Sequence, residues 1–138
     1  MWDWRAPVEA AADAVGLPVV LYDIPARTGT PIEYDSLVRL SRHERILAVK
    51  DAKADLFQGS RVMAETDLGY YSGDDAMNLA WLTHGATGVV SVVGHVAAGR
   101  YAEMIQAVLN GQVIQVTPNE GDGWTDMDPS VAITTLVR

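Results

Sequence analysis

Short apolar or aromatic runs alternate along this chain with stretches of helical periodicity, and this alternation restricts its fold more than any other feature. The runs stand at residues 19–22, 46–49, 69–72 and 89–93. Turn-forming residues separate them from the helix-like stretches. Strands that alternate with helices in this way are typical of a parallel sheet built from βα units. The sequence therefore predicts an α/β fold with four βα units preceded by one helix.

The predicted helices are bounded by recognisable capping signals. Helices are expected at residues 7–15, 30–42, 55–66, 76–84 and 97–109. The second is expected to begin with Thr30 as the N-cap, Pro31 at the first helical position and Glu33 completing a capping box. From Gln112 onward the sequence has no helical period. We therefore expect an α/β unit over residues 1–111 and an irregular tail over 112–138.

Charge and cysteine content exclude several classes of function. The 138 residues include 10 lysines and arginines against 18 aspartates and glutamates, which gives a net charge of -8, and there is no cysteine. Because the basic side chains are scattered among acids, the chain is not expected to bind nucleic acid. No apolar run approaches the ~20 residues that a membrane-spanning helix needs, and no signal-peptide pattern opens the sequence. A soluble, cytoplasmic protein is expected.

Polar side chains gather at the predicted carboxyl ends of the strands, where parallel α/β folds build their sites. Lys50 is the most informative, because an apolar run leads directly to its ammonium group. Alternation predicts that Ile46, Ala48 and Lys50 share one face of the strand. A desolvated lysine has a lowered pKa and can attack a carbonyl to form a Schiff base. The commoner arrangement stays open as well, in which Lys50 pairs with Asp51 or Asp74 and emerges into water.

Tyr22 ends the preceding strand, and a tyrosine there is a candidate proton shuttle beside a Schiff-base lysine. The plainer alternative is a core aromatic whose hydroxyl reaches solvent.

Other chemistries have no support in the sequence. The first βα join lacks the glycine pattern of a dinucleotide fold, and no phosphate-binding GxxxxGK[ST] motif occurs. The histidines lie on different predicted elements without a second ligand nearby, so no metal site is expected.

Three segments together resemble a known family. They read LYDIPARTG, AVKDAKADL and YYSGDDAMNLAWLTHGATGVVSVVGHVAA. In this order they resemble the dihydrodipicolinate synthase (4-hydroxy-tetrahydrodipicolinate synthase) family of pyruvate-dependent class I aldolases, over roughly residues 5–111. The resemblance implies a partial (β/α)8 TIM barrel, with the four predicted strands as its fifth to eighth. It also implies a Schiff-base lyase that condenses pyruvate with aspartate semialdehyde in lysine (diaminopimelate) biosynthesis.

The resemblance implies a role for each of five residues. Lys50 matches the lysine that forms the Schiff base with pyruvate, and Tyr22 matches the tyrosine that relays protons to the adduct. Val90 matches the residue whose backbone carbonyl lies against pyruvate. Arg27 matches the arginine that helps receive aspartate semialdehyde, and Gly73 lines the pocket beside the lysine. No cofactor or metal is implied, because pyruvate is held covalently, and a homo-oligomer is expected.

The chain also departs from the family pattern. The first four strands and the C-terminal helical extension of the family have no counterpart here, and a complete barrel of this type takes ~250 residues. The sequence is therefore expected to be a fragment, and a catalytically inactive half barrel that pairs with a second copy is one alternative function. Another is a sugar-acid aldolase such as N-acetylneuraminate lyase, which shares the lysine and the tyrosine. Arg27 and the neighbouring acids Asp74 and Asp75 favour the synthase.

Overall fold

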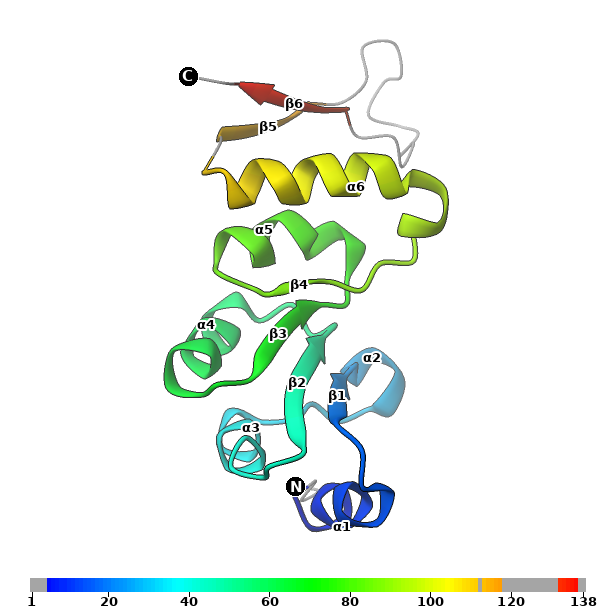
Figure 1. Ribbon diagram of the computed structural model, residues 1–138, viewed down its shortest axis with the longest axis vertical. Helices are drawn as coiled ribbons and strands as arrows, with labels where there is room; N and C mark the ends of the chain where they lie inside the picture. The colour runs from blue at the N-terminus through cyan, green and yellow to red at the C-terminus, as the bar shows by residue number, and fades with distance from the viewer. Residues whose placement is uncertain (1–4, 112, 118–131, 137–138) are drawn as a thin grey trace. The chain divides into compact units, whose positions relative to one another are not determined.

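The computed structural model describes residues 5–111, 113–117 and 132–136. These form two compact units that divide between Val90 and Ser91. Helices and strands alternate along the first unit (Figure 1). Its elements are α1 (Arg5–Val15), β1 (Val19–Asp23), α2 (Pro25–Thr28), α3 (Tyr34–Leu40), β2 (Ile46–Asp51), α4 (Leu56–Glu65), β3 (Gly69–Ser72), the 3-10 helix η1 (Asp75–Met77), α5 (Asn78–Thr83) and β4 (Gly88–Val89).

The first unit is built on one parallel sheet with the strand order β1-β2-β3-β4. Each strand pairs with the next one along the sequence, so the helices between them act as crossover connections. The register places Tyr22 beside Lys50 and Lys50 beside Tyr71. Tyr71 in turn lies beside Gly88 on β4. This arrangement confirms the predicted α/β class.

The hydrophobic core of the first unit lies between the sheet and its helices. Ala12 of α1, Leu37 of α3, Val62 of α4 and Trp81 of α5 are each fully buried in one cluster. Burial of large apolar side chains on this face supplies the main stabilisation of the unit. The opposite face carries side chains that are about half exposed: Val20, Tyr22, Leu47 and Val90. The sheet thus has one covered and one open face within the described part of the chain.

A bulge interrupts the alternation of β2. Val19 pairs with Ile46 but Val20 pairs with Ala48, so one extra residue stands on β2 at this point. Ile46 and Val49 consequently both belong to the hydrophobic core cluster, which does not include Ala48. The strict alternation expected from the sequence, with Ile46 on the same face as Lys50, therefore fails at the start of the strand. Beyond the bulge the alternation is regular, because a bulge displaces the pattern only locally.

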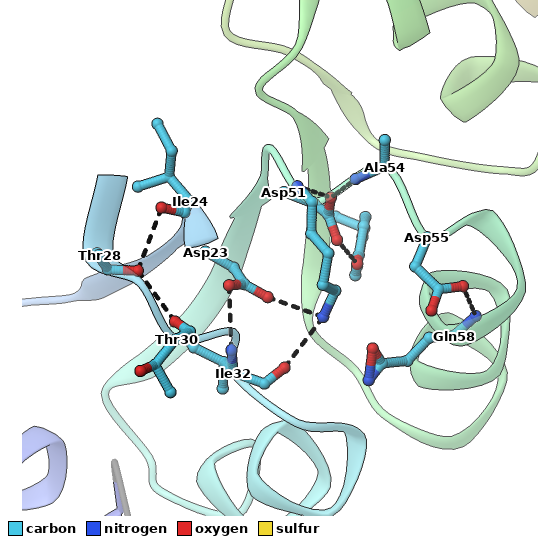
Figure 2. Close-up of polar contacts among 11 residues, drawn as sticks. Asp23, Ile24, Thr28, Thr30, Ile32, Asp51, Ala54, Asp55 and Gln58 are labelled. Carbon is cyan, nitrogen blue, oxygen red and sulfur yellow. Dashed lines mark hydrogen bonds and ion pairs between the residues drawn. The ribbon is translucent and has the colours of Figure 1, made fainter. Parts of the chain in front are cut away.

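The predicted start of the α3 helix is wrong. α3 begins at Tyr34, after Glu33 as its N-cap, and that N-cap makes no side-chain capping bond. The backbone N–H of Ile32, expected in the first turn of a helix, instead donates to Oδ1 of Asp23 at 3.1 Å. This tertiary hydrogen bond keeps the segment before Tyr34 out of the helix. The helix predicted over residues 55–66 is confirmed, because Asp55 caps α4 by accepting from the backbone N–H of Gln58 at 2.9 Å (Figure 2).

The fourth strand is shorter than the sequence predicts. β4 ends at Val89 instead of residue 93. The backbone N–H of Val90 adds one further bond to the carbonyl oxygen of Ser72 at 2.8 Å. Ser91 already belongs to a turn, since its hydroxyl oxygen accepts from the backbone N–H of Gly94 at 2.8 Å. The β-branched residues of this segment favour a strand, but the turn interrupts it.

The second unit consists of α6 (Gly94–Leu109), β5 (Val113–Thr117) and β6 (Ala132–Leu136). α6 includes a non-helical residue at Ala97, where the predicted helix was expected to start. β5 and β6 pair in antiparallel fashion, which differs from the irregular tail expected after Gly111.

In the residues that the structure describes, no helix combines the length and the apolarity needed to cross a membrane.

Candidate active site

Tyr22 and Lys50 lie side by side near the carboxyl ends of β1 and β2. They are register partners in the parallel ladder, and alternation directs both side chains to the open face of the sheet. The Lys50 amine lies 4.0 Å from the centre of the Tyr22 ring, within the range of a cation–π contact. Lys50 is half-buried, and Tyr22 is 45% exposed. The structure thus brings together an amine and a phenol on a face that small molecules can reach.

Gly73, just after β3, leaves room for the Lys50 side chain. A Cβ placed on Gly73 would lie 2.8 Å from both Cγ and Cε of Lys50 and 3.1 Å from the carbonyl oxygen of Asp51. The two distances to Lys50 are shorter than real Cβ atoms show, and the distance to Asp51 is tight, so any side chain here would force Lys50 to shift, and glycine permits the close approach. The backbone N–H of Gly73 also donates to that Asp51 carbonyl at 2.7 Å, which fixes the glycine at the strand end.

The other two expected site residues lie on neighbouring segments. Val90 follows β4 directly, and its bond to Ser72 places it at the carboxyl end of that strand beside β3. Arg27 lies in α2, and its side chain is exposed. Its loop is held by the Thr28 hydroxyl, which contacts the carbonyl oxygens of Ile24 at 3.2 Å and Thr30 at 2.9 Å (Figure 2). These two contacts tie the end of α2 to the residues on either side of the helix.

The surface ion pair considered as an alternative for Lys50 is not formed. Both carboxylate oxygens of Asp51 are engaged elsewhere, with the backbone N–H groups of Lys53 (2.8 Å) and Ala54 (2.9 Å) and with the Tyr70 hydroxyl (2.5 Å). The Asp74 carboxylate accepts from the backbone N–H of Ala76 at 3.0 Å and caps η1. Among the ion pairs in the described part of the chain, none includes Lys50.

A buried polar cluster lies on the opposite face of the sheet from Tyr22 and Lys50. We call it the strand-end network, and it consists of Asp23, Ile32, Asp51, Lys53 and Tyr70. Burial, and secondly the hydrogen bond to Asp51, raise the pKa of the Tyr70 phenol. Sequence reasoning missed this network. A signal was present, because a carboxylate directly follows each of the two expected reacting residues.

Comparisons with known proteins place this chain among relatives of one family. A sequence model described as the dihydrodipicolinate synthetase family matches residues 8–120. The 4-hydroxy-tetrahydrodipicolinate synthase of Kineococcus radiotolerans is 59% identical over 103 residues, which are 75% of this chain and 33% of that protein. Dihydrodipicolinate synthase DapA-2 of Bacillus anthracis is 40% identical with a TM-score of 0.73, over 75% of this chain and 36% of that one.

A third relative was solved with a ligand. The chloride-inhibited dihydrodipicolinate synthase of Acinetobacter baumannii, complexed with pyruvate, is 32% identical with a TM-score of 0.70 over 75% of this chain and 36% of that one. This chain therefore spans about a third of the length of the relatives that it matches. Four parallel strands alternating with helices, as in these relatives, correspond to part of a (β/α)8 barrel. The chain belongs to the dihydrodipicolinate synthetase family.

Proposed function

We propose that this chain carries the Schiff-base part of a 4-hydroxy-tetrahydrodipicolinate synthase site, which condenses pyruvate with aspartate semialdehyde in lysine biosynthesis. The neighbouring placement of the Lys50 amine and the Tyr22 ring, 4.0 Å apart on the open face of the sheet, is the observation that carries the proposal. The names of relatives that are 54–59% identical over the same segment support it. Such a reaction proceeds on a covalent adduct and needs no metal or separate cofactor.

The first step joins Lys50 to pyruvate. The neutral amine adds to the C2 carbonyl carbon, the carbonyl oxygen takes up protons and leaves as water, and a C=N bond to Nζ remains. The Tyr22 phenol is the proposed proton relay for that oxygen, because the centre of its ring, on the adjoining strand β1, lies 4.0 Å from the Lys50 amine. Loss of a proton from the methyl carbon then gives an enamine. That carbon attacks the aldehyde carbon of aspartate semialdehyde, so the new carbon–carbon bond forms as the C=O π bond opens and the oxygen takes up a proton. The C=N bond to Nζ is restored in the same step, and its hydrolysis by water releases the product and the free amine.

The remaining site residues have positioning and binding roles in this proposal. Gly73 keeps space for the Lys50 side chain and its adduct. The backbone carbonyl of Val90 lies against bound pyruvate, and the exposed guanidinium of Arg27 receives the carboxylate of aspartate semialdehyde. We further propose that residues 1–111 form the barrel segment and that the protein acts in the cytoplasm. We also propose that it forms a homo-oligomer, and the half-exposed apolar side chains of the open face support this last point.

Borohydride trapping with pyruvate tests the proposal directly. Hydride reduces the C=N bond to a stable secondary amine, so the intact mass rises by one pyruvic acid minus one oxygen atom. The chain has two lysines, Lys50 and Lys53, which provides a matched control. Trapping is expected in the wild type and in Lys53→Arg, with the adduct on Lys50, and it is expected to be lost in Lys50→Ala. An adduct on Lys53 or on the N-terminal amine alone would contradict the proposal.

A second measurement addresses the second substrate. After pyruvate is bound, aspartate semialdehyde and a sugar aldehyde are offered separately, and the condensation products are identified by mass. Product with aspartate semialdehyde alone supports the synthase. Product with the sugar aldehyde alone would assign the chain to the sugar-acid aldolases. Arg27→Ala is expected to weaken use of aspartate semialdehyde while pyruvate trapping persists, because the guanidinium contacts the second substrate only.

A further inference from the structure

Each of the two proposed reacting residues is followed by a buried carboxylate on the other face of the sheet. Asp23 follows Tyr22 and is 1% exposed, and Asp51 follows Lys50 and is 0% exposed. Alternation along a strand sends neighbouring side chains to opposite faces. Whatever holds these two carboxylates therefore also fixes the strand ends that carry the phenol and the amine.

Asp23 is held in a closed set of three contacts. Its Oδ1 accepts from the backbone N–H of Ile32 at 3.1 Å, and its Oδ2 pairs with Nζ of Lys53 at 2.8 Å. The same Nζ donates to the carbonyl oxygen of Ile32 at 3.0 Å. Figure 2 shows the Asp23 carboxylate directed toward Ile32, from the end of β1 to the segment before α3. The set therefore ties three separate segments together.

Lys53 is fixed through its backbone as well as through its side chain. Asp51 Oδ1 accepts from the backbone N–H groups of Lys53 and Ala54, and this turn holds Ala54 at a φ of 65°. Oδ2 of Asp51 accepts from the Tyr70 hydroxyl on β3. The lysine that reaches Asp23 thus starts from a turn that is anchored to both β2 and β3.

We infer that the ion pair of Asp23 and Lys53 is a positioning device that aligns Tyr22 with Lys50, an inference that rests on the function proposed above. The side chains of the pair are 1% and 12% exposed, so water cannot readily replace either partner. Removing one charge alone leaves the other buried without a partner, and it must move toward solvent. The ladder bond from the Ala52 N–H to the Asp23 carbonyl, at 2.8 Å, remains and keeps the strands paired. Loss of the ion pair therefore shifts the strand ends without dismantling the sheet.

The side-chain NMR signal of Lys50 reports this alignment without any substrate. An aromatic ring shifts the resonances of protons held over its face, so the Lys50 ε-protons in the wild type are expected upfield of their position in Tyr22→Leu. Lysine labelled with 13C at Cε gives resolved signals for only two lysines. The Lys53 signal is assigned by Lys53→Arg. A wild-type Lys50 signal equal to that in Tyr22→Leu would overturn the inference.

The variants separate positioning from general stability. In Lys53→Met the Lys50 signal is expected to move most of the way toward its Tyr22→Leu position, and Lys53→Arg, which keeps the charge, is expected to restore it. If Lys53→Met does not fold, the double variant Asp23→Asn with Lys53→Met takes its place. It removes both charges, so no buried charge is left without a partner. Asp13→Asn is the matched control, because it removes an exposed carboxylate from an ion pair with Arg45. The inference would be overturned if, in every folded variant, the Lys50 signal moved no further than it does in Asp13→Asn.

Pyruvate trapping distinguishes failure of the inference from failure of the proposed function. In Lys53→Met the rate constant of trapping is expected to fall by about tenfold or more, since small displacements of reacting groups have effects of that order. Lys53→Arg is expected to recover most of the rate. Absence of trapping in the wild type would refute the proposed function, and the NMR comparison would still decide the alignment. Normal trapping together with an unmoved Lys50 signal in Lys53→Met would refute the inference alone.

Discussion

Gly73 lies so close to Lys50 that a methyl group on its α-carbon would sit 2.8 Å from two carbons of the lysine side chain. In Gly73→Ala the Lys50 side chain must therefore shift from its present position over Tyr22. We expect trapping by pyruvate to slow by about tenfold or more and the free energy of unfolding to fall by about 1–3 kcal/mol. Intact-mass kinetics and urea denaturation measure the two effects.

The control for this substitution is Gly99→Ala. Gly99 lies within α6, and a Cβ placed there meets no atom within 4 Å. Alanine in an open helical position is expected to stabilise by roughly 0.5–1 kcal/mol. Trapping by Gly73→Ala at the rate of Gly99→Ala would show that the close approach of Gly73 does not determine where Lys50 lies.

The buried Tyr70 phenol should make stability depend on alkaline pH. Its pKa in the folded protein is raised above the ordinary value of 10.0, first by burial and then by the Asp51 hydrogen bond. Above about pH 10 the unfolded chain therefore holds fewer protons than the folded one, and stability falls as pH rises, by about 1.4 kcal/mol per pH unit. Below pH 10 the contribution of the Tyr70 phenol to the free energy of unfolding is fully present.

Tyr70→Phe tests this dependence, because phenylalanine cannot ionise. At neutral pH the variant is expected to be less stable by about 1–3 kcal/mol, since Asp51 loses a hydrogen-bond donor inside the core. The difference between wild type and variant should shrink as pH rises above 10, in urea denaturation followed by circular dichroism. Parallel curves for the two proteins would contradict the expectation.

Gly59 on α4 is a second position where the core excludes a side chain. A Cβ there would lie 2.2 Å from the Trp81 ring and 2.9 Å from the Tyr70 hydroxyl oxygen. Trp81 is fully buried and has little space in which to move. Gly59→Ala is expected to lower the free energy of unfolding by about 1–3 kcal/mol or more through overpacking. Urea denaturation beside the Gly99→Ala control measures it, and equal stability of the two variants would contradict the expectation.

The open face of the sheet should drive association of the 138-residue chain. Val20 is 59% exposed and Leu47 is 51% exposed. Each large apolar side chain gains about 1.5–3 kcal/mol when it is fully buried, so we expect oligomers at concentrations well above micromolar. Light scattering measures the mass. Val20→Thr with Leu47→Thr should shift it toward the monomer, whereas a monomeric wild type under these conditions would refute the prediction.

Most of the fold could be predicted from the sequence because the core strands are short apolar runs with clear ends. β3 has the predicted bounds, and β1 and β2 each start at the predicted residue. The start of α3 could not be predicted, since the group that takes the Ile32 N–H is a carboxylate nine residues earlier in the chain. A local capping pattern does not show that a side chain distant in the sequence will accept from a backbone N–H of the expected first turn.

Part of the candidate site was predictable on the same basis. The rule that polar residues gather at the carboxyl ends of parallel strands predicts Tyr22 and Lys50 as neighbours, and the register places them so. The contacts of Lys53 were not predictable. Its partners are Asp23 and Ile32, which come from another strand and another loop, and they meet only once β1 and β2 have paired.

Tyr22 and Asp23 are successive residues on opposite faces of the sheet, as are Lys50 and Asp51, and this alternation limits where the length of the chain can change. Inserting or deleting a single residue within the regular part of either strand would turn the carboxylate outward and drive the amine or the phenol into the apolar interior. Changes of length are therefore tolerable only outside the regular part of each strand. The proposed reaction therefore depends on the spacing of residues within each strand as well as on their identities.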